Sequence, residues 1–183
     1  MKQRLMVFAL AGLAGCSGGS RVQTANSPSR IATPNAAQTN PPGDIPDSQA
    51  FVRFSLPGKY SVLYPEGWSQ SGTSADTIFA SSYNGEQLLS QAPADPAFVI
   101  HRMFPGVRNI VVHRQTQPNG LVATATFTSK SLPDAITGRS APLENAAFFF
   151  VKGHRETILN LWAPAGSDNV DQWKKISASF RWK

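Results

Sequence analysis

Short runs of alternating or continuous apolar residues, separated by turn-forming residues, occupy the chain from residue 51 toward its C-terminal end. Runs of this length that are rich in β-branched and aromatic residues predict β-strands. Pro57-Gly58, Asn84-Gly85 and Pro118-Asn119-Gly120 supply turns between them. We therefore expect strands at 51–55, 59–64, 76–83, 86–90, 109–116, 121–130, 146–151 and 157–162.

Two of these runs are apolar on both of their alternating faces. They are AAFFFV at 146–151 and TILNLW at 157–162, joined through Gly153 and His154. Apolar residues on both faces are typical of central strands that are covered on both sides. In the run at 121–130, by contrast, threonine alternates with alanine or phenylalanine, which predicts one solvent-exposed face.

A first helix is predicted in the segment ADPAFVIHRMFPG. Asp95 supplies an N-cap, Pro96 suits the first turn, and Pro105-Gly106 supplies a stop. Apolar residues four positions apart then share one face, which predicts a helix at 95–104.

A second helix is predicted near the C-terminal end, at 168–179. Ser167 or Asp168 can cap it. Its apolar residues recur at helical spacing; they are Val170, Trp173, Ile176 and Phe180.

The predicted elements favour an α+β fold. Both central strands need a cover on each side, and the two helices can supply these covers. We expect an α/β sandwich in which helices flank a central antiparallel sheet. Trp68, Trp162 and Trp173 are candidate core residues, since burying an aromatic ring removes a large apolar area from water.

The first 16 residues have the pattern of a secretory signal. Lys2 and Arg4 precede an uncharged, mostly apolar run at 5–14, which is too short for a membrane-spanning helix of roughly 20 residues. LAGC at 13–16 resembles the lipobox of bacterial lipoprotein precursors. The resemblance implies that Cys16 is alkylated by a diacylglycerol and that the chain is cut before it; a buried or chance cysteine is the alternative.

Residues 16–49 are predicted to be a flexible linker that carries the lipidated cysteine. They are rich in Ser, Gly, Pro, Asn, Thr and Gln, and beyond alanine their apolar side chains are Val22, Ile31 and Ile45. Such a segment buries too little apolar surface to offset the entropy of ordering its backbone. We therefore expect a signal peptide at 1–15 and one domain at 50–183, with docking of Ile31 or Ile45 onto the domain as the alternative.

Two segments of the domain resemble the PsbP-like family. YSVLYPEGW begins at Tyr60, and ILNLWAPAGSDNVDQWKKISASFRW ends near the C-terminal end. The positions that carry the resemblance are Tyr60, Tyr64, Pro65, Gly67, Trp68, Ala163, Pro164, Ser179 and Phe180. The family includes an extrinsic photosystem II subunit, bacterial lipoproteins of the DcrB-like kind and a Ran-binding nuclear-transport factor. The resemblance implies the same sandwich and a role in binding.

Composition and charge narrow the possible partners. Removal of residues 1–15 deletes Lys2 and Arg4 from the 17 basic residues and leaves 15 against 11 acidic ones. These basic residues are scattered and form no docking module for nucleic acid, so we expect no nucleic-acid partner. A lipidated Cys16 also leaves no thiol for a disulfide within the mature chain.

Candidate chemistry is sparse. His101, His113 and His154 lie in separate elements and form no metal-binding pattern, so we expect no metal or cofactor. The sequence has no G-x-S-x-G motif and no motif-level pair of carboxylates, so we expect no catalytic residues. The strongest local feature is the basic hairpin tip formed by Lys152, His154 and Arg155, which is either a solvated turn or a contact for a partner or for lipid headgroups.

These observations together predict a membrane-anchored envelope lipoprotein. It would be a non-enzymatic binding or accessory subunit of a membrane or envelope complex, held by Cys16 on the extracytoplasmic side of the cell membrane or outer membrane, with a protein partner. Two alternatives stay open. A small envelope hydrolase would need His113 or His154 beside an acid in a pocket, and a carrier of an apolar ligand would need a closed cavity beside the sheet.

Overall fold

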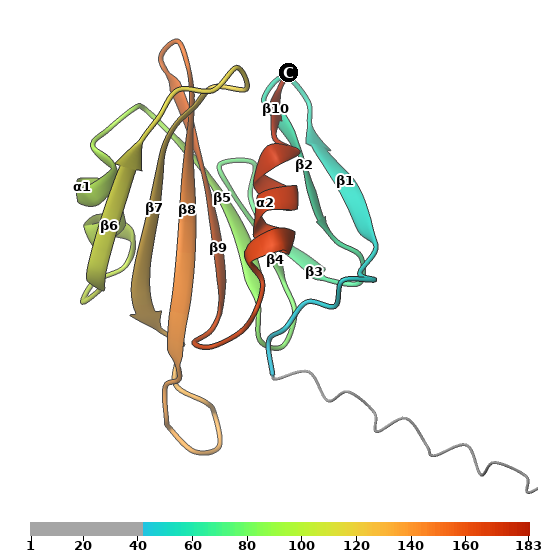
Figure 1. Ribbon diagram of the computed structural model, residues 1–183, viewed down its shortest axis with the longest axis vertical. Coiled ribbons are helices and arrows are strands. Elements are labelled where there is room, and N and C mark those ends of the chain that lie inside the picture. The colour runs from blue at the N-terminus through green and yellow to red at the C-terminus, as the bar shows by residue number, and fades with distance from the viewer. Residues whose placement is uncertain (1–41) are drawn as a thin grey trace, which may run out of the picture. The chain divides into compact units, whose positions relative to one another are not determined.

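The computed structural model describes residues 42–183, which form two antiparallel sheets and two helices (Figure 1). The larger sheet contains, in spatial order, β3 (Ser69–Gly72), β4 (Asp76–Ala80), β5 (Gly85–Gln91), β9 (Arg155–Pro164), β8 (Pro142–Lys152), β7 (Leu121–Lys130) and β6 (Arg108–Arg114). The smaller sheet contains β1 (Phe51–Leu56), β2 (Tyr60–Pro65) and β10 (Arg181–Trp182). The helices are α1 (Pro96–Met103) and α2 (Val170–Ala178). Neither helix of residues 42–183 is long and apolar enough to cross a bilayer.

The larger sheet separates two apolar cores, which makes the domain an α+β sandwich, as predicted. The core beneath α1 contains Val99, Ile100, Ala123, Ala125, Phe127, Ala147, Phe149 and Ile158. The core on the other face, beneath α2 and the smaller sheet, contains Tyr60, Val62, Phe79, Leu88, Leu121, Phe150, Leu159, Leu161, Ile176 and Phe180. Figure 1 shows α1 beside β6 at one side and α2 with the smaller sheet at the other.

The β8–β9 hairpin divides its side chains between these two cores, as its two apolar faces predict. Phe149 and Ile158 enter the core beneath α1, and Phe150 and Leu159 enter the other core. All four side chains are at most 1% exposed. Each such burial contributes about 1.5–3 kcal/mol relative to an exposed side chain, so this hairpin is the centre of the domain.

Several positions of the PsbP-like resemblance meet in the second core. The ring of Phe180 stacks on Phe150 with centroids 3.9 Å apart, and Tyr60 lies 5.7 Å from Phe180. Tyr64 stacks on Phe79 at 4.1 Å. These residues come from both ends of the domain and close it around the central hairpin.

The first two predicted strands form a sheet of their own. Tyr60 and Val62 turn inward and are fully buried in the second core. They share this core with Ile176 of α2, which spans nine residues. The smaller sheet therefore covers part of this face of the larger sheet, where the sequence predicted a helix alone.

The predicted cap of α2 was wrong. The N-cap is Asn169, and neither Ser167 nor Asp168 takes this position. The Asn169 side chain makes no capping hydrogen bond, because its amide binds a segment far away in sequence, described below.

The sequence predicted a turn at Asn84-Gly85, but Gly85 is not part of a turn. It is the first residue of β5 and pairs with Trp162 of β9. A Cβ on Gly85 would lie 1.8 Å from the indole of Trp162, so glycine is needed for this close approach. The three predicted core tryptophans, Trp68, Trp162 and Trp173, are each half-buried rather than fully enclosed.

The ordered domain begins upstream of the predicted boundary at residue 50. Residues 43–47, here called the strap, pack against α2 and the β4–β5 turn. Ile45 is 4% exposed, and its N–H donates to Asn169 Oδ1 at 2.7 Å. The side-chain amides of Asn84 and Asn169 both donate to the Gly43 carbonyl at 2.8 Å.

Two acids complete the contacts of the strap. Asp44 Oδ1 accepts from the Asp168 N–H at 2.9 Å, and Asp47 Oδ1 accepts from Gln172 Nε2 at 2.9 Å. The assignment of this segment to a flexible linker is therefore corrected, because polar groups at the start of α2 bind its backbone. Val22 and Ile31 lie outside the described residues.

Truncation of Ile45 tests the strap. Ile45→Ala is expected to lower the free energy of unfolding by about 2–5 kcal/mol, because it empties a buried site. The matched control is Ile136→Ala, at a position that is 94% exposed, with an expected change within about 0.5 kcal/mol. Urea unfolding of the three proteins measures both values; equal midpoints would show that the strap adds nothing to stability.

Candidate functional site

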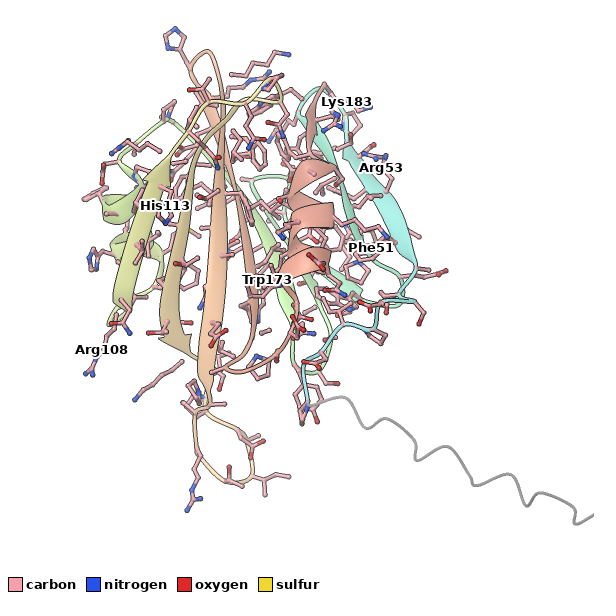
Figure 2. The ribbon with its side chains drawn as sticks, in the orientation of Figure 1. Phe51, Arg53, Arg108, His113, Trp173 and Lys183 are labelled. Carbon is pink, nitrogen blue, oxygen red and sulfur yellow. The ribbon has the colours of Figure 1, made fainter. Side chains whose placement is uncertain are left out.

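The three histidines do not come together. His101 is exposed on α1, His113 is exposed on β6, and His154 is exposed in the β8–β9 turn. Figure 2 shows His113 on β6, the edge strand of the larger sheet, at the other side of the view from Lys183. Among residues 42–183, no three His, Cys, Asp or Glu side chains gather in an arrangement that could hold a metal ion. The structure thus gives the hydrolase alternative no histidine-based site in the described part of the chain.

Cys16, the predicted lipidation site, lies outside the described residues. Its role stays a prediction from the sequence.

The predicted basic tip is held rigidly by the central hairpin. Lys152 pairs with Arg155 across β8 and β9, and Gly153 has the positive φ of 61° that the tight turn requires. Arg155 is fixed further, because its Nη1 donates to the Gly58 carbonyl at 3.0 Å and its guanidinium lies over the Trp182 ring at 5.4 Å.

The structure brings three more cations to this tip. Lys59 follows the β1–β2 turn, and Arg181 and Lys183 flank Trp182 at the end of the described chain. The backbone N–H of Lys183 donates to the Lys59 carbonyl at 3.0 Å, which places the two side by side. We call the group of Lys59, Lys152, Arg155, Arg181 and Lys183 around Trp182 the cationic end.

Neutral backbone carbonyl oxygens bind three of the five basic groups of the cationic end, those of Lys59, Arg155 and Arg181. Lys59 Nζ donates to Ser74 O at 3.0 Å, and Arg181 Nη1 donates to Ala178 O at 2.7 Å. Both ion pairs formed within residues 42–183 lie elsewhere, at Arg114–Asp95 and Lys174–Asp171. The positive charge of this end is therefore left without a carboxylate partner in the described structure.

Sequence reasoning found part of this cluster. It identified Lys152, His154 and Arg155, because they are neighbours in sequence, and it missed Lys59, Arg181 and Lys183. The available signal was the sequence Arg181-Trp182-Lys183, in which one cation precedes and one follows a tryptophan. Arg181 and Trp182 form the two-residue strand β10.

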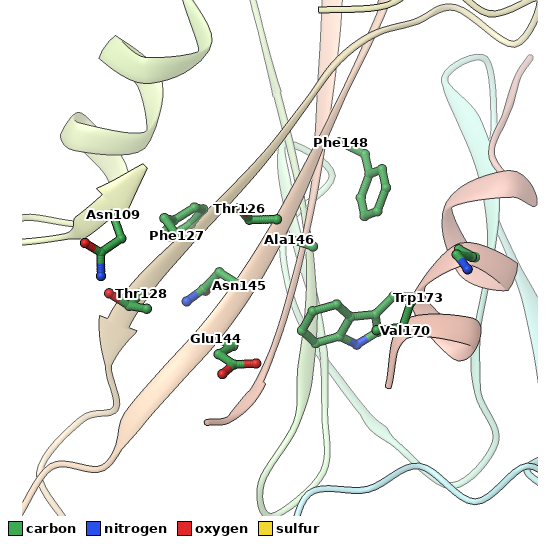
Figure 3. Close-up of a pocket in the computed structure, with 11 residues that line it drawn as sticks. Asn109, Thr126, Phe127, Thr128, Glu144, Asn145, Ala146, Phe148, Val170 and Trp173 are labelled. Atoms are coloured by element: carbon green, nitrogen blue, oxygen red, sulfur yellow. The ribbon is translucent and has the colours of Figure 1, made fainter. Parts of the chain in front are cut away.

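A second feature is a groove of about 480 Å³ between α2 and the uncovered face of β7 and β8 (Figure 3). Phe148 and Trp173 lie on one side of it, and Thr128, Asn109 and Glu144 lie on the other. The groove is open to solvent. It therefore differs from the closed cavity that a carrier of an apolar ligand would need.

Glu86 is the most unusual titratable group of the described chain. Its side chain is fully buried beside Phe79 and Leu161, and neither carboxyl oxygen has a hydrogen-bond partner among the described residues. Burial raises the pKa of Glu86 well above its ordinary value of 4.5. Burial, and secondarily the charge of Glu86, also raises the pKa of Tyr60. An acid enclosed in the core cannot meet a substrate, so its effect is on stability.

No protein-family model and no curated protein matches this chain, but several solved structures do. The Ran-binding protein Mog1p of Saccharomyces cerevisiae matches with a TM-score of 0.50 and 7% identity, over 73% of this chain and 96% of Mog1p. Cyanobacterial PsbP (CyanoP) from Synechocystis matches with a TM-score of 0.48 and 13% identity, over 77% and 98%.

A structure from Bacteroides thetaiotaomicron matches with a TM-score of 0.44 and 11% identity, over 72% of this chain. The chain spans about half of that protein, 48%. At these identities a likeness shows the fold alone. The likeness to Mog1p confirms the fold that the PsbP-like resemblance implied, since that family includes a Ran-binding factor.

Replacement of Glu86 tests the effect of its burial. Because the folded state raises the pKa of Glu86, the folded state holds the proton more tightly than the unfolded state. The contribution of Glu86 to the free energy of unfolding should therefore be largest below pH 4.5 and fall as the pH rises toward the folded-state pKa, by up to about 1.4 kcal/mol per pH unit. Glu86→Gln should remove this slope.

Urea unfolding at a series of pH values from about pH 4 upward measures the slope. Glu66→Gln, at an exposed glutamate, is the matched control and should keep the wild-type pH dependence. Parallel curves for wild type and Glu86→Gln would show that Glu86 ionises without cost in the folded protein.

Proposed function

We propose that this chain is a lipid-anchored, non-enzymatic binding domain that captures an acidic partner protein through its cationic end. The observation that carries the proposal is the cluster of five basic residues that find no carboxylate partner in the described structure. Arg155, Arg181 and Lys59 are fixed by hydrogen bonds to backbone carbonyls. Fixed charges lose little entropy on binding and raise the rate of encounter with an opposite charge.

The cationic end lies at the opposite end of the domain from residue 42. In Figure 1 the coloured ribbon begins at residue 42 at the bottom of the domain, whereas the β8–β9 turn and the C-terminus lie at the top. The predicted anchor, Cys16, precedes residue 42 in the chain. The anchor is expected to connect to the domain through a flexible linker, so the cationic end can meet a protein partner.

The anchor itself rests on the sequence. LAGC at 13–16 follows a basic and then an apolar segment, which supports lipidation of Cys16 and a location on the extracytoplasmic side of the cell membrane or outer membrane. The solved structure of Mog1p is described as that of a Ran-binding protein. A binding role for this chain agrees with that description by analogy of fold.

Removal of the anchor is the first test. Cys16→Ala should move the protein from the detergent phase to the aqueous phase, because the acyl chains contribute about 0.8 kcal/mol per buried methylene. The control is Ser17→Ala, which leaves the cysteine in place. Phase partitioning of both proteins, expressed with their signal sequence, measures the effect; a mutant that still enters the detergent phase would reveal another anchor.

Charge reversal at the tip is the second test. Lys152 lies at one end of β8, whereas Lys130 pairs with Pro142 at the other end, so Lys152→Glu and Lys130→Glu change net charge equally at opposite ends. The partner is first identified by cross-linking in membranes and then purified. Lys152→Glu should lower the association rate by about 3- to 10-fold at low salt and much less at high salt.

Lys130→Glu should leave the association rate close to that of wild type, and the melting temperature should change little in both variants. Equal losses in the two variants would mean that only net charge matters. An unchanged rate for Lys152→Glu would place the contact on another face.

A further inference from the structure

We infer that the cationic end takes an acidic peptide segment, which lies across the indole of Trp182 and places a carboxylate in the pocket on each side of it. This inference rests on the proposed function and names the chemistry of its partner. It uses Trp182, Lys59 and Arg181, which the hairpin tip alone does not include.

The first pocket lies on the Arg155 side of Trp182. It has a volume of about 240 Å³ and is lined by Lys59, Ser90, Gln91, Arg155, Glu156, Thr157 and Trp182. Arg155 uses Nη1 for the Gly58 carbonyl and keeps other N–H donors free, and Lys59 adds a second positive charge. The hydroxyl groups of Ser90 and Thr157 lie 3.5 Å apart and offer further donors.

The one acidic residue that lines this pocket, Glu156, is already hydrogen-bonded within the domain. Glu156 is 2% exposed, and its Oε2 accepts from Gln91 Nε2 at 2.8 Å. The cation that interacts with the Glu156 carboxylate is Arg102 of α1, which lies on the opposite side of the sheet from Trp182. Lys59 and Arg155 are therefore left for an external carboxylate.

The second pocket lies on the Lys152 side of Trp182. It has a volume of about 370 Å³ and is lined by Pro118, Asn119, Gly120, Val151, Lys152, Arg181 and Trp182. Arg181 is held by the carbonyls of Ala178 and Phe180, at 2.7 and 2.6 Å. Each pocket thus contains two cations, and charge-assisted hydrogen bonds from arginine to carboxylate are among the strong ones.

Trp182 is a fixed wall between the two pockets. It pairs with Tyr60 through β10, and its ring meets Phe180 edge-on at 5.3 Å and 88°. Gly120, with φ of 89°, lies against the indole; a Cβ there would be 2.8 Å from Trp182 Nε1. A flat ring held in this way gives the backbone of an extended segment a surface to pack on.

Two separate pockets with two cations each favour a chain that carries several carboxylates over a single anion. One small anion would occupy one pocket and leave the other charged pair unmatched. An extended acidic segment extends from one pocket to the other in a single binding event, so the second contact forms at high effective concentration. Its charge is also complementary to that of the cationic end.

The test uses a synthetic glutamate-rich peptide as the probe and a peptide of equal length with glutamine at every glutamate position. Calorimetric titration of the full mature protein should show binding of the first peptide, weakened by salt, and no binding of the second. Vesicles of anionic phospholipid form a third arm, in which the Cys16→Ala protein is used so that the anchor does not insert.

Four variants separate the two pockets. Lys59→Gln removes one cation of the first pocket and Arg181→Gln one of the second, and each should weaken peptide binding about 3- to 10-fold. Trp182→Phe retains a ring but shortens the wall, and should weaken binding by a similar factor. Lys130→Gln, at the end of β7 that pairs with the far end of β8, should have no effect.

The outcomes distinguish this inference from the function on which it rests. If Lys152→Glu slows association of the purified partner but Lys59→Gln, Arg181→Gln and Trp182→Phe bind the peptide like wild type, the two-pocket site is wrong and the proposed function stands. If the protein binds anionic vesicles but not the acidic peptide, or binds both peptides equally, the inference is also overturned. Selective loss in the three variants, with melting temperatures near that of wild type, supports it.

Discussion

The constraint on which the domain depends is the need to cover both faces of the β8–β9 hairpin. Phe149 and Ile158 on one face, and Phe150 and Leu159 on the other, are fully buried. Helix α1 packs on the first face, and α2 and the smaller sheet pack together on the second. Burial fixes the hairpin along its length, so the turn at Gly153 projects from a rigid base. The cationic end is positioned as a consequence of core packing.

The smaller sheet and α2 cover only part of the second face of the larger sheet, and a groove lies beside the uncovered part. The smaller sheet and α2 lie over β4, β5 and β9, whereas the threonine face of β7 stays open beside α2. Trp173 and Phe148 therefore line an open groove instead of a closed core. The same layer encloses Glu86 completely. One face of the sheet thus contains both an aromatic pair that is open to solvent and a carboxyl group that is fully buried. The reason is that α2 and the smaller sheet cover only part of this face.

The sequence predicts the central hairpin, both helices and the wet face of β7, because each depends on local periodicity and on residues close together in the chain. It does not predict β3, whose sequence SQSG is polar and fully exposed, or β10, which has only two residues. The strap escapes prediction because its polar residues are typical of linkers, and the side chains of Asn84, Asn169 and Gln172 that bind it lie far away in sequence. Lys59 and Lys183 meet through tertiary structure alone.

The C-terminal segment connects the two ends of the domain. Asn169 binds the strap, and α2 follows directly. After α2, Ser179 Oγ accepts from the Leu63 N–H at 2.8 Å and Phe180 stacks in the second core. The next residues, Arg181 and Trp182, form β10 and are part of the cationic end.

Fifteen residues, 169–183, therefore run from the strap to the candidate site. Because α2 packs through the buried residues Gln172, Ile176 and Ser177 and Phe180 is fully buried, the strap and the cationic end are held at a fixed distance.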